Sequence, residues 1–123
     1  QLGDTRNAER RIDVNTILNA VYQYSLDNNG NFPAGIDSAT STSQVLGTDA
    51  TGCDTSCVTA TTTIAACVDL SASLTPTYLV SIPRDPKTGS STNSGYYLNK
   101  RGDGRLTVGS CGPENSAVIN VTR

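Results

Sequence analysis

Four cysteines have the clearest chemistry in this chain: Cys53, Cys57, Cys67 and Cys111. An even number of cysteines in a small chain that is poor in charge and rich in serine, threonine and glycine is typical of disulfides formed in an oxidising compartment. A zinc site is the rival, but zinc ribbons use Cys-x2-Cys pairs, whereas three, nine and 43 residues separate these cysteines and histidine is absent. We therefore predict disulfides and an extracellular or periplasmic location.

The pairing of the cysteines is open, because four cysteines allow three pairings. We predict that Cys53 pairs with Cys57 and closes a small loop. Cys67 would then pair with Cys111 and tie that loop to the C-terminal strands.

Residues suited to catalysis are sparse. Without histidine, a serine or cysteine nucleophile lacks its commonest base. Glu9 and Glu114 are the only glutamates, and the aspartates cluster in loops and helix caps, so a glycosidase-like carboxylate pair is not indicated. The formal net charge is -2, and the arginines near the N-terminus alternate with acidic residues, so the chain shows no basic patch for nucleic acid. We expect no enzymatic activity, no cofactor or metal, and no nucleic-acid partner.

Three short motifs have ordinary structural explanations. Asp27-x-Asn29-x-Asn31 lacks the glycine and glutamate of a calcium loop and reads as a helix cap. Arg101-Gly102-Asp103 is the tripeptide that integrins bind, but glycine and aspartate are also common in hairpin turns. Asn120-Val121-Thr122 matches a glycosylation acceptor, although it lies in a predicted strand.

The elements that position these residues begin with a helix over residues 1–28. Its apolar stripe repeats every 3.6 residues and comprises Val14, Ile17, Leu18, Val21 and Tyr24. Arg6 and Arg10 occupy the same stripe earlier, so we expect the first three turns to project from the domain. A second, weaker stripe holds Ala8, Ile12, Tyr22 and Leu26, and either faces a neighbouring molecule or consists of scattered surface residues.

The rest of the chain predicts a small sheet. Residues 29–66 read as a long αβ loop, and residues 67–94 as a connecting segment with a short helical turn near residues 69–74. Residues 95–123 read as an antiparallel meander, with strands at 96–100 and 105–110 and a third at 117–122. The predicted fold class is α+β: one domain, 1–123, in which a long N-terminal amphipathic helix packs on three or four antiparallel strands.

With these elements placed, the chain resembles the soluble domains of type IV pilins and type II secretion pseudopilins. The resemblance lies in an order of short motifs that cover a little over half of the chain: RNAERRIDVNTI at 6–17, LDNNGNFP at 26–33, LTPTYL at 74–79, IPRDPKTG at 82–89 and GYYL at 95–98. Segment 87–94 lacks the carboxylates of the calcium loop of major pseudopilins, so no metal is carried over. The four cysteines also differ from the single C-terminal bridge of many pilins.

The resemblance implies a structural subunit of a bacterial filament that assembles with like subunits through its N-terminal helix. It implies charged contacts between subunits at Arg6, Glu9, Arg10 and Asp13, with Ile12 and Tyr22 facing a neighbour. Further implied partners are the inner-membrane assembly machinery and the membrane itself, through a preceding apolar helix. The alternative is a secreted, disulfide-stapled adhesin or binding module that forms no filaments.

Overall fold

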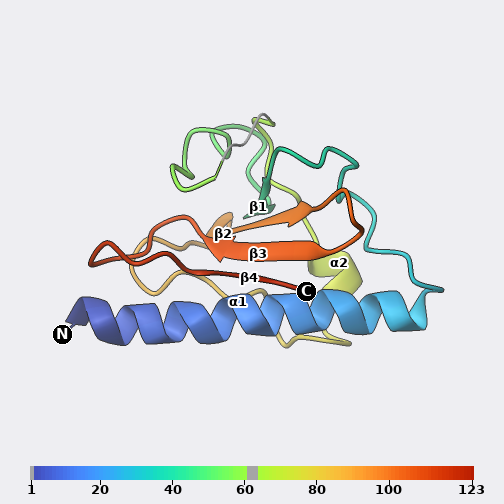
Figure 1. Ribbon diagram of the computed structural model, residues 1–123, viewed down its shortest axis with the longest axis horizontal. Helices are drawn as coiled ribbons and strands as arrows, with labels where there is room; N and C mark the ends of the chain where they lie inside the picture. Colours follow the sequence, from blue (N-terminus) through green and yellow to red (C-terminus); the bar gives the residue numbers. More distant parts are fainter. Residues whose placement is uncertain (1, 61–63) are drawn as a thin grey trace.

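The computed structural model describes residues 2–60 and 64–123 and contains a long helix packed on a four-stranded antiparallel sheet (Figure 1). In chain order the elements are α1 (Leu2–Asp27), β1 (Gln44–Gly47), α2 (Ser71–Leu74), β2 (Asn93–Lys100), β3 (Leu106–Ser110) and β4 (Asn120–Thr122). The predicted α+β class is confirmed.

Helix α1 ends where the sequence provides a left-handed cap. Asn29 and Gly30 both have positive φ, at 58° and 82°. The Gly30 N–H donates to the Ser25 carbonyl at 2.7 Å, which satisfies a carbonyl at the helix end. The cap interpretation of the Asp27-x-Asn29-x-Asn31 motif is therefore confirmed.

The strands follow the order β1-β2-β3-β4 across the sheet. The predicted meander corresponds to β2, β3 and β4, and the Arg101-Gly102-Asp103 tripeptide lies in the turn between β2 and β3. Strand β1 comes from the predicted αβ loop and pairs with β2, for example Val45 opposite Tyr97. The 29–66 segment is thus not loop throughout, and β2 begins two residues before the predicted boundary at residue 95.

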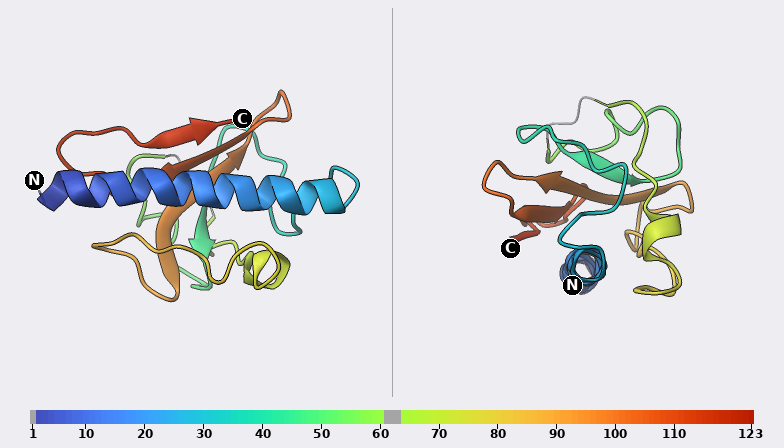
Figure 2. Two further views of the ribbon diagram at one scale, coloured as in Figure 1. Left: turned by 90° about the horizontal axis from the view of Figure 1, so that it is seen from below. Right: turned by 90° about the vertical axis from the view of Figure 1, so that its right-hand side faces the viewer.

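One face of the sheet packs on α1, and the other faces the described residues between β1 and α2, 48–60 and 64–70 (Figures 1 and 2). Side chains alternate along β2 because successive residues of a strand point to opposite faces. Tyr96 and Leu98 join the cluster beneath the helix, whereas Tyr97 joins a smaller cluster on the far side. The core residues that α1 contributes are Val14, Ile17, Leu18, Ala20 and Val21.

The predicted disulfide pairing is wrong, although all four cysteines are in disulfides. Cys53 pairs with Cys67, and Cys57 pairs with Cys111. The reason is that the chain returns beside β1: Leu46 bridges Val68, and the Cys67 N–H donates to the Asp49 carbonyl at 2.9 Å. This return places Cys67 at the base of the loop next to Cys53, and leaves Cys57 to face the end of β3.

Helix α2 confirms the short helical turn predicted at residues 69–74. Leu70 and Leu74 are both buried in the cluster beneath α1. Two residues four apart on one helical turn point to the same side, which is why this short element reaches the core.

Candidate assembly surface on the N-terminal helix

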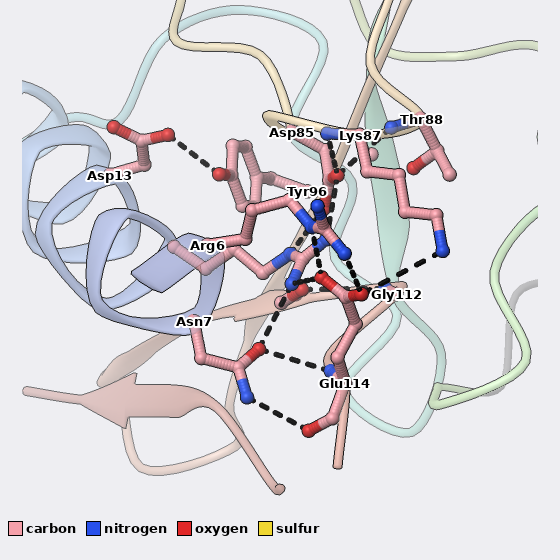
Figure 3. Close-up of polar contacts among 12 residues, drawn as sticks. Arg6, Asn7, Asp13, Asp85, Lys87, Thr88, Tyr96, Gly112 and Glu114 are labelled. Atoms are coloured by element: carbon pink, nitrogen blue, oxygen red, sulfur yellow. Dashed lines mark hydrogen bonds and ion pairs between the residues drawn. The ribbon is translucent and has the colours of Figure 1, made fainter. Parts of the chain in front are cut away.

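The first turns of α1 do not project from the domain, so that prediction is wrong. Asn7 is 3% exposed and Arg10 is completely buried. The turns are covered by two loops that each supply a carboxylate: Asp85, before β2, and Glu114, before β4 (Figure 3). Ion pairs with these loops replace the apolar contacts that the first turns lack.

Arg10 and Asp85 form a two-point ion pair. The Arg10 Nε donates to Asp85 Oδ2 at 2.7 Å and its Nη2 donates to Asp85 Oδ1 at 3.0 Å. Arg10 Nη1 donates to Asn7 Oδ1 at 2.9 Å and to Glu114 Oε2 at 2.7 Å. Four hydrogen bonds therefore satisfy the buried guanidinium, as a charge removed from water requires.

Glu114 joins the loop to the first two turns of the helix. Arg6 donates from Nε to Glu114 Oε2 at 2.6 Å and from Nη2 to Oε1 at 2.5 Å. The side-chain amide of Asn7 bonds to the backbone of Glu114. It donates to the Glu114 carbonyl at 2.8 Å and accepts from the Glu114 N–H at 3.0 Å. The Lys87 Nζ lies 3.7 Å from Glu114 Oε1, and the Lys87 side chain is largely exposed to solvent. Arg6, Asn7, Arg10, Asp85 and Glu114 are called the polar latch below.

The latch shifts the pKa values of its carboxyls downward. Hydrogen bonds from Arg6 and then Arg10 hold the pKa of Glu114 well below its ordinary value. Burial alone would raise the pKa of Asp85, but hydrogen bonds from Arg10 and from the Thr88 and Lys87 backbone outweigh it, so the net shift is downward. Both carboxylates are therefore ionised at neutral pH.

Asp13 lies one turn further along α1 and contacts the sheet. Its Oδ2 accepts a 2.6 Å hydrogen bond from the hydroxyl of Tyr96, a residue with no exposed surface. Burial raises the pKa of Asp13, and this effect exceeds the lowering by the Tyr96 hydrogen bond. Burial and the Asp13 carboxylate together raise the pKa of Tyr96, so its hydroxyl stays protonated.

Tyr22 contacts its own chain through both its ring and its hydroxyl. The ring packs edge-to-face on Phe32, with centroids 5.6 Å apart. The hydroxyl donates to the Arg123 carbonyl, and the Arg123 guanidinium donates to Asn15 and Asn19 at 2.9 Å each. The chain end after β4 thus covers part of the second stripe of the helix.

Glu9 and Ile12 are the two proposed interface residues that are free to meet another molecule. Ile12 is 65% exposed, Glu9 is exposed, and further along the same helix Leu26 is 75% exposed. Arg6, Arg10, Asp13 and Tyr22 instead have partners within the chain. Residues Ala8, Glu9, Ile12 and Leu26 are called the outer face of α1 below.

Asn7, Asp85 and Glu114, which hold the first turns of α1 to the domain, were not among the residues predicted from the sequence. The sequence does contain a sign of these partners. Arg6 and Arg10 lie one turn apart on the helix stripe that continues into the core, and a buried arginine needs a carboxylate nearby. The IPRDPKTG segment contains one of these carboxylates, and Glu114 is one of only two glutamates.

The latch positions a helix and offers no reactive group, because its charged side chains are paired with each other. Across residues 2–60 and 64–123, no cluster of three side chains suited to a metal ion occurs. Within the same residues, no helix has the length and apolarity needed to cross a membrane. The two disulfides are compatible with an extracellular or periplasmic location.

In comparisons with known proteins, no family model, curated protein or solved structure matches this chain.

Proposed function

We propose that this chain is a structural subunit of a bacterial extracellular or periplasmic filament, of the type IV pilus or type II secretion pseudopilus class. The observation that carries the proposal is the outer face of α1. It lies on a 26-residue helix whose opposite face packs on the sheet and whose first turns are clamped by the polar latch.

Rigidity is what makes this face suited to repeated assembly. An association loses less free energy to ordering when the surface is already fixed. An isolated polar helical end would fray in water. In this chain the latch holds the first turns to loops that carry Asp85 and Glu114, so Glu9 and Ile12 are presented in one geometry.

Three of the four charged residues have a different role from the contacts between subunits that the resemblance implies. Arg6, Arg10 and Asp13 position the helix, because their side chains bond to Glu114, Asp85 and Tyr96. Glu9 and Ile12 keep the role of contacts to a neighbouring subunit. Tyr22 braces the chain end against the helix and reaches a neighbour only with the exposed part of its ring.

The order of motifs shared with pilins and pseudopilins also supports the proposal. On this account the partners are like subunits and the inner-membrane assembly machinery. On the same account, the subunit is anchored in the inner membrane before it assembles.

A secreted binding module is the second candidate, and the disulfide-bonded region is the feature that favours it. Cys53, Cys57 and Cys67 anchor a polar segment, described over residues 52–60 and 64–67, on the side of the sheet opposite α1 (Figure 1). Such a segment is fixed at its base and open to partners at its surface. This candidate predicts surface binding without filaments.

The test compares substitutions on the outer face of α1 with one elsewhere. Ile12→Asp and Glu9→Arg, made in the full reading frame in the native host, should abolish filaments in sheared fractions seen by electron microscopy. Val118→Asp is the matched control, because Val118 is 82% exposed and lies outside the helix. Circular dichroism and thermal unfolding of the purified domains should show that all three variants fold. Wild-type filament yield in both helix variants would refute the proposal, and retained surface binding by a protein that never forms filaments would favour the second candidate.

A further inference from the structure

A pocket on the side of the domain that carries α2 is independent of the outer face of α1. Its lining residues come from the end of β1, from α2 and the two residues before it, and from the chain segments around residues 80–84 and 90–94. No residue of α1 lines it, and its volume is about 200 Å³.

The floor of the pocket is apolar and fixed. Leu46 and Leu70 are each 1% exposed and belong to the main core, and Ile82 packs against it. Val80, which is 96% exposed, stands at the edge. A ligand can therefore place a flat apolar surface on a rigid base.

The rim is polar, and five of its groups lack a partner within the described part of the chain. They are the Arg84 guanidinium, Asp69 Oδ2 and the hydroxyls of Thr48, Ser81 and Ser91. Asp69 uses its other oxygen, Oδ1, to accept from the Ser71 N–H at 3.0 Å and from the Ser71 hydroxyl at 2.6 Å. These bonds fix the carboxylate while leaving Oδ2 available.

Arg84 and Asp69 both line the pocket, and within the described residues no ion pair joins their side chains. This differs from the polar latch, where the arginines are bonded to carboxylates. A planar guanidinium that is not paired is well matched to a ligand carboxylate, which it can bind through two parallel hydrogen bonds. Asp69 Oδ2 can only accept, so it suits ligand hydroxyls.

We propose that this pocket binds an acidic monosaccharide, a single sugar ring that carries one carboxylate. The carboxylate lies on Arg84, the ring hydroxyls bond to Asp69 Oδ2 and to the serine and threonine hydroxyls, and the C–H face of the ring rests on Leu70 and Ile82. The volume supports one ring, because drug-sized ligands occupy pockets of roughly 300–1,000 Å³. The pocket has no aromatic side chain for stacking, so we expect a Kd on the order of 1 mM.

The test is a titration of the folded protein with sodium glucuronate, followed by backbone amide chemical shifts. Saturable shifts should appear at pocket residues such as Ser71, Ser81 and Ser91. Arg84→Ala should weaken binding at least tenfold, since it removes a charged hydrogen-bond donor. Arg105→Ala is the matched control, because Arg105 is also an exposed arginine but lies in the turn before β3, and it should leave the Kd unchanged.

Three further probes decide what the pocket recognises. Glucose, which has the ring but no carboxylate, and sodium acetate, which has the carboxylate but no ring, should each bind at least tenfold more weakly than glucuronate. Leucine tests a zwitterionic amino acid as the occupant. Absence of localised shifts with glucuronate, an unchanged Kd in Arg84→Ala, equal binding of glucose or acetate, or tighter binding of leucine would each overturn the proposal. None of these results bears on filament assembly, which depends on a different surface.

Discussion

Arg10 on the third turn of α1 and Asp85, 75 residues later, form a fully buried two-point ion pair. The pair replaces apolar packing at the place where the helix leaves the hydrophobic core. It lets a helix with arginines on its inner stripe remain attached to the domain. The outer face of α1 depends on this attachment for its fixed geometry.

Removing Arg10 should destabilise the domain strongly. Arg10→Met leaves Asp85 buried without its guanidinium, and breaking a buried ion pair on one side costs about 3–5 kcal/mol. Urea unfolding measures the loss, and amide hydrogen exchange should show faster opening of the first turns of α1. Arg11→Met is the control, because Arg11 is the adjacent exposed arginine, and it should change stability by no more than about 0.5 kcal/mol. Equal stability of the two variants would show that the latch does not hold the helix.

The domain should lose stability in acid through Asp85 and Glu114. Their pKa values lie below the ordinary 3.8 and 4.5, so they stabilise the fold while ionised, and this contribution is lost as the pH falls through and below those values. Stability should be nearly constant from pH 7 to about 5 and then fall. Glu114→Gln should lower stability at neutral pH and make the acid decline shallower. An unchanged pH profile in Glu114→Gln would contradict the role of the latch.

Tyr96→Phe should raise the pKa of Asp13 further. The Tyr96 hydroxyl donates the 2.6 Å bond that partly offsets the burial of this carboxyl. Without it the ionised form of Asp13 is less favoured, and the loss of stability at neutral pH should be about 1–3 kcal/mol. Because Asp13 titrates above its ordinary pKa in the folded state, the variant should recover stability as the pH falls toward that pKa. Carbon NMR of the Asp13 carboxyl measures the shift, and a pKa equal to that of the wild type would contradict the prediction.

The two disulfides should stabilise the fold unequally. Cys57 and Cys111 are 54 residues apart, whereas Cys53 and Cys67 are 14 apart. In the chain-entropy account, the double substitution Cys57→Ala and Cys111→Ala lowers the free energy of unfolding by about 4 kcal/mol. The double substitution Cys53→Ala and Cys67→Ala, which removes the shorter bridge, lowers it by about 3 kcal/mol. Thermal unfolding of both variants tests this order.

The pairing itself is tested by Cys111→Ala alone. This variant should leave one free thiol, located at Cys57 by alkylation and peptide mass spectrometry. Alkylation at Cys67 would instead support the pairing expected from the sequence.

The elements that are set by neighbouring residues could be predicted from the sequence. The 3.6-residue spacing of Val14, Ile17, Leu18 and Val21 predicts the helix and its buried face, and the glycines around Asp103 predict the turn between β2 and β3. Strand β1 was missed because it is four residues long and its pairing partner lies about 50 residues later in the chain, so no local pattern marks it. The disulfide pairing was missed for the same reason, since the Leu46 bridge to Val68 decides it.

The candidate site was predicted in part. Three residues of the outer face of α1, Ala8, Ile12 and Leu26, belong to the second stripe that the sequence shows, and all three are exposed. The burial of Arg10 could not be found from the helix alone, because its partners lie 75 and 104 residues away. The local pattern shows only a polar turn, and it is the distant carboxylates that bring this turn into the domain.

Photo-crosslinking at position 12 tests the central claim most directly. A photoreactive phenylalanine analogue replaces Ile12 in the full protein, in the native host, and the same analogue at Val118 serves as the control. The filament account predicts a ladder of covalent multimers of this chain after illumination at position 12 and none at position 118. Only monomer at position 12, or equal ladders at both positions, would contradict the claim that the outer face of α1 joins one subunit to the next.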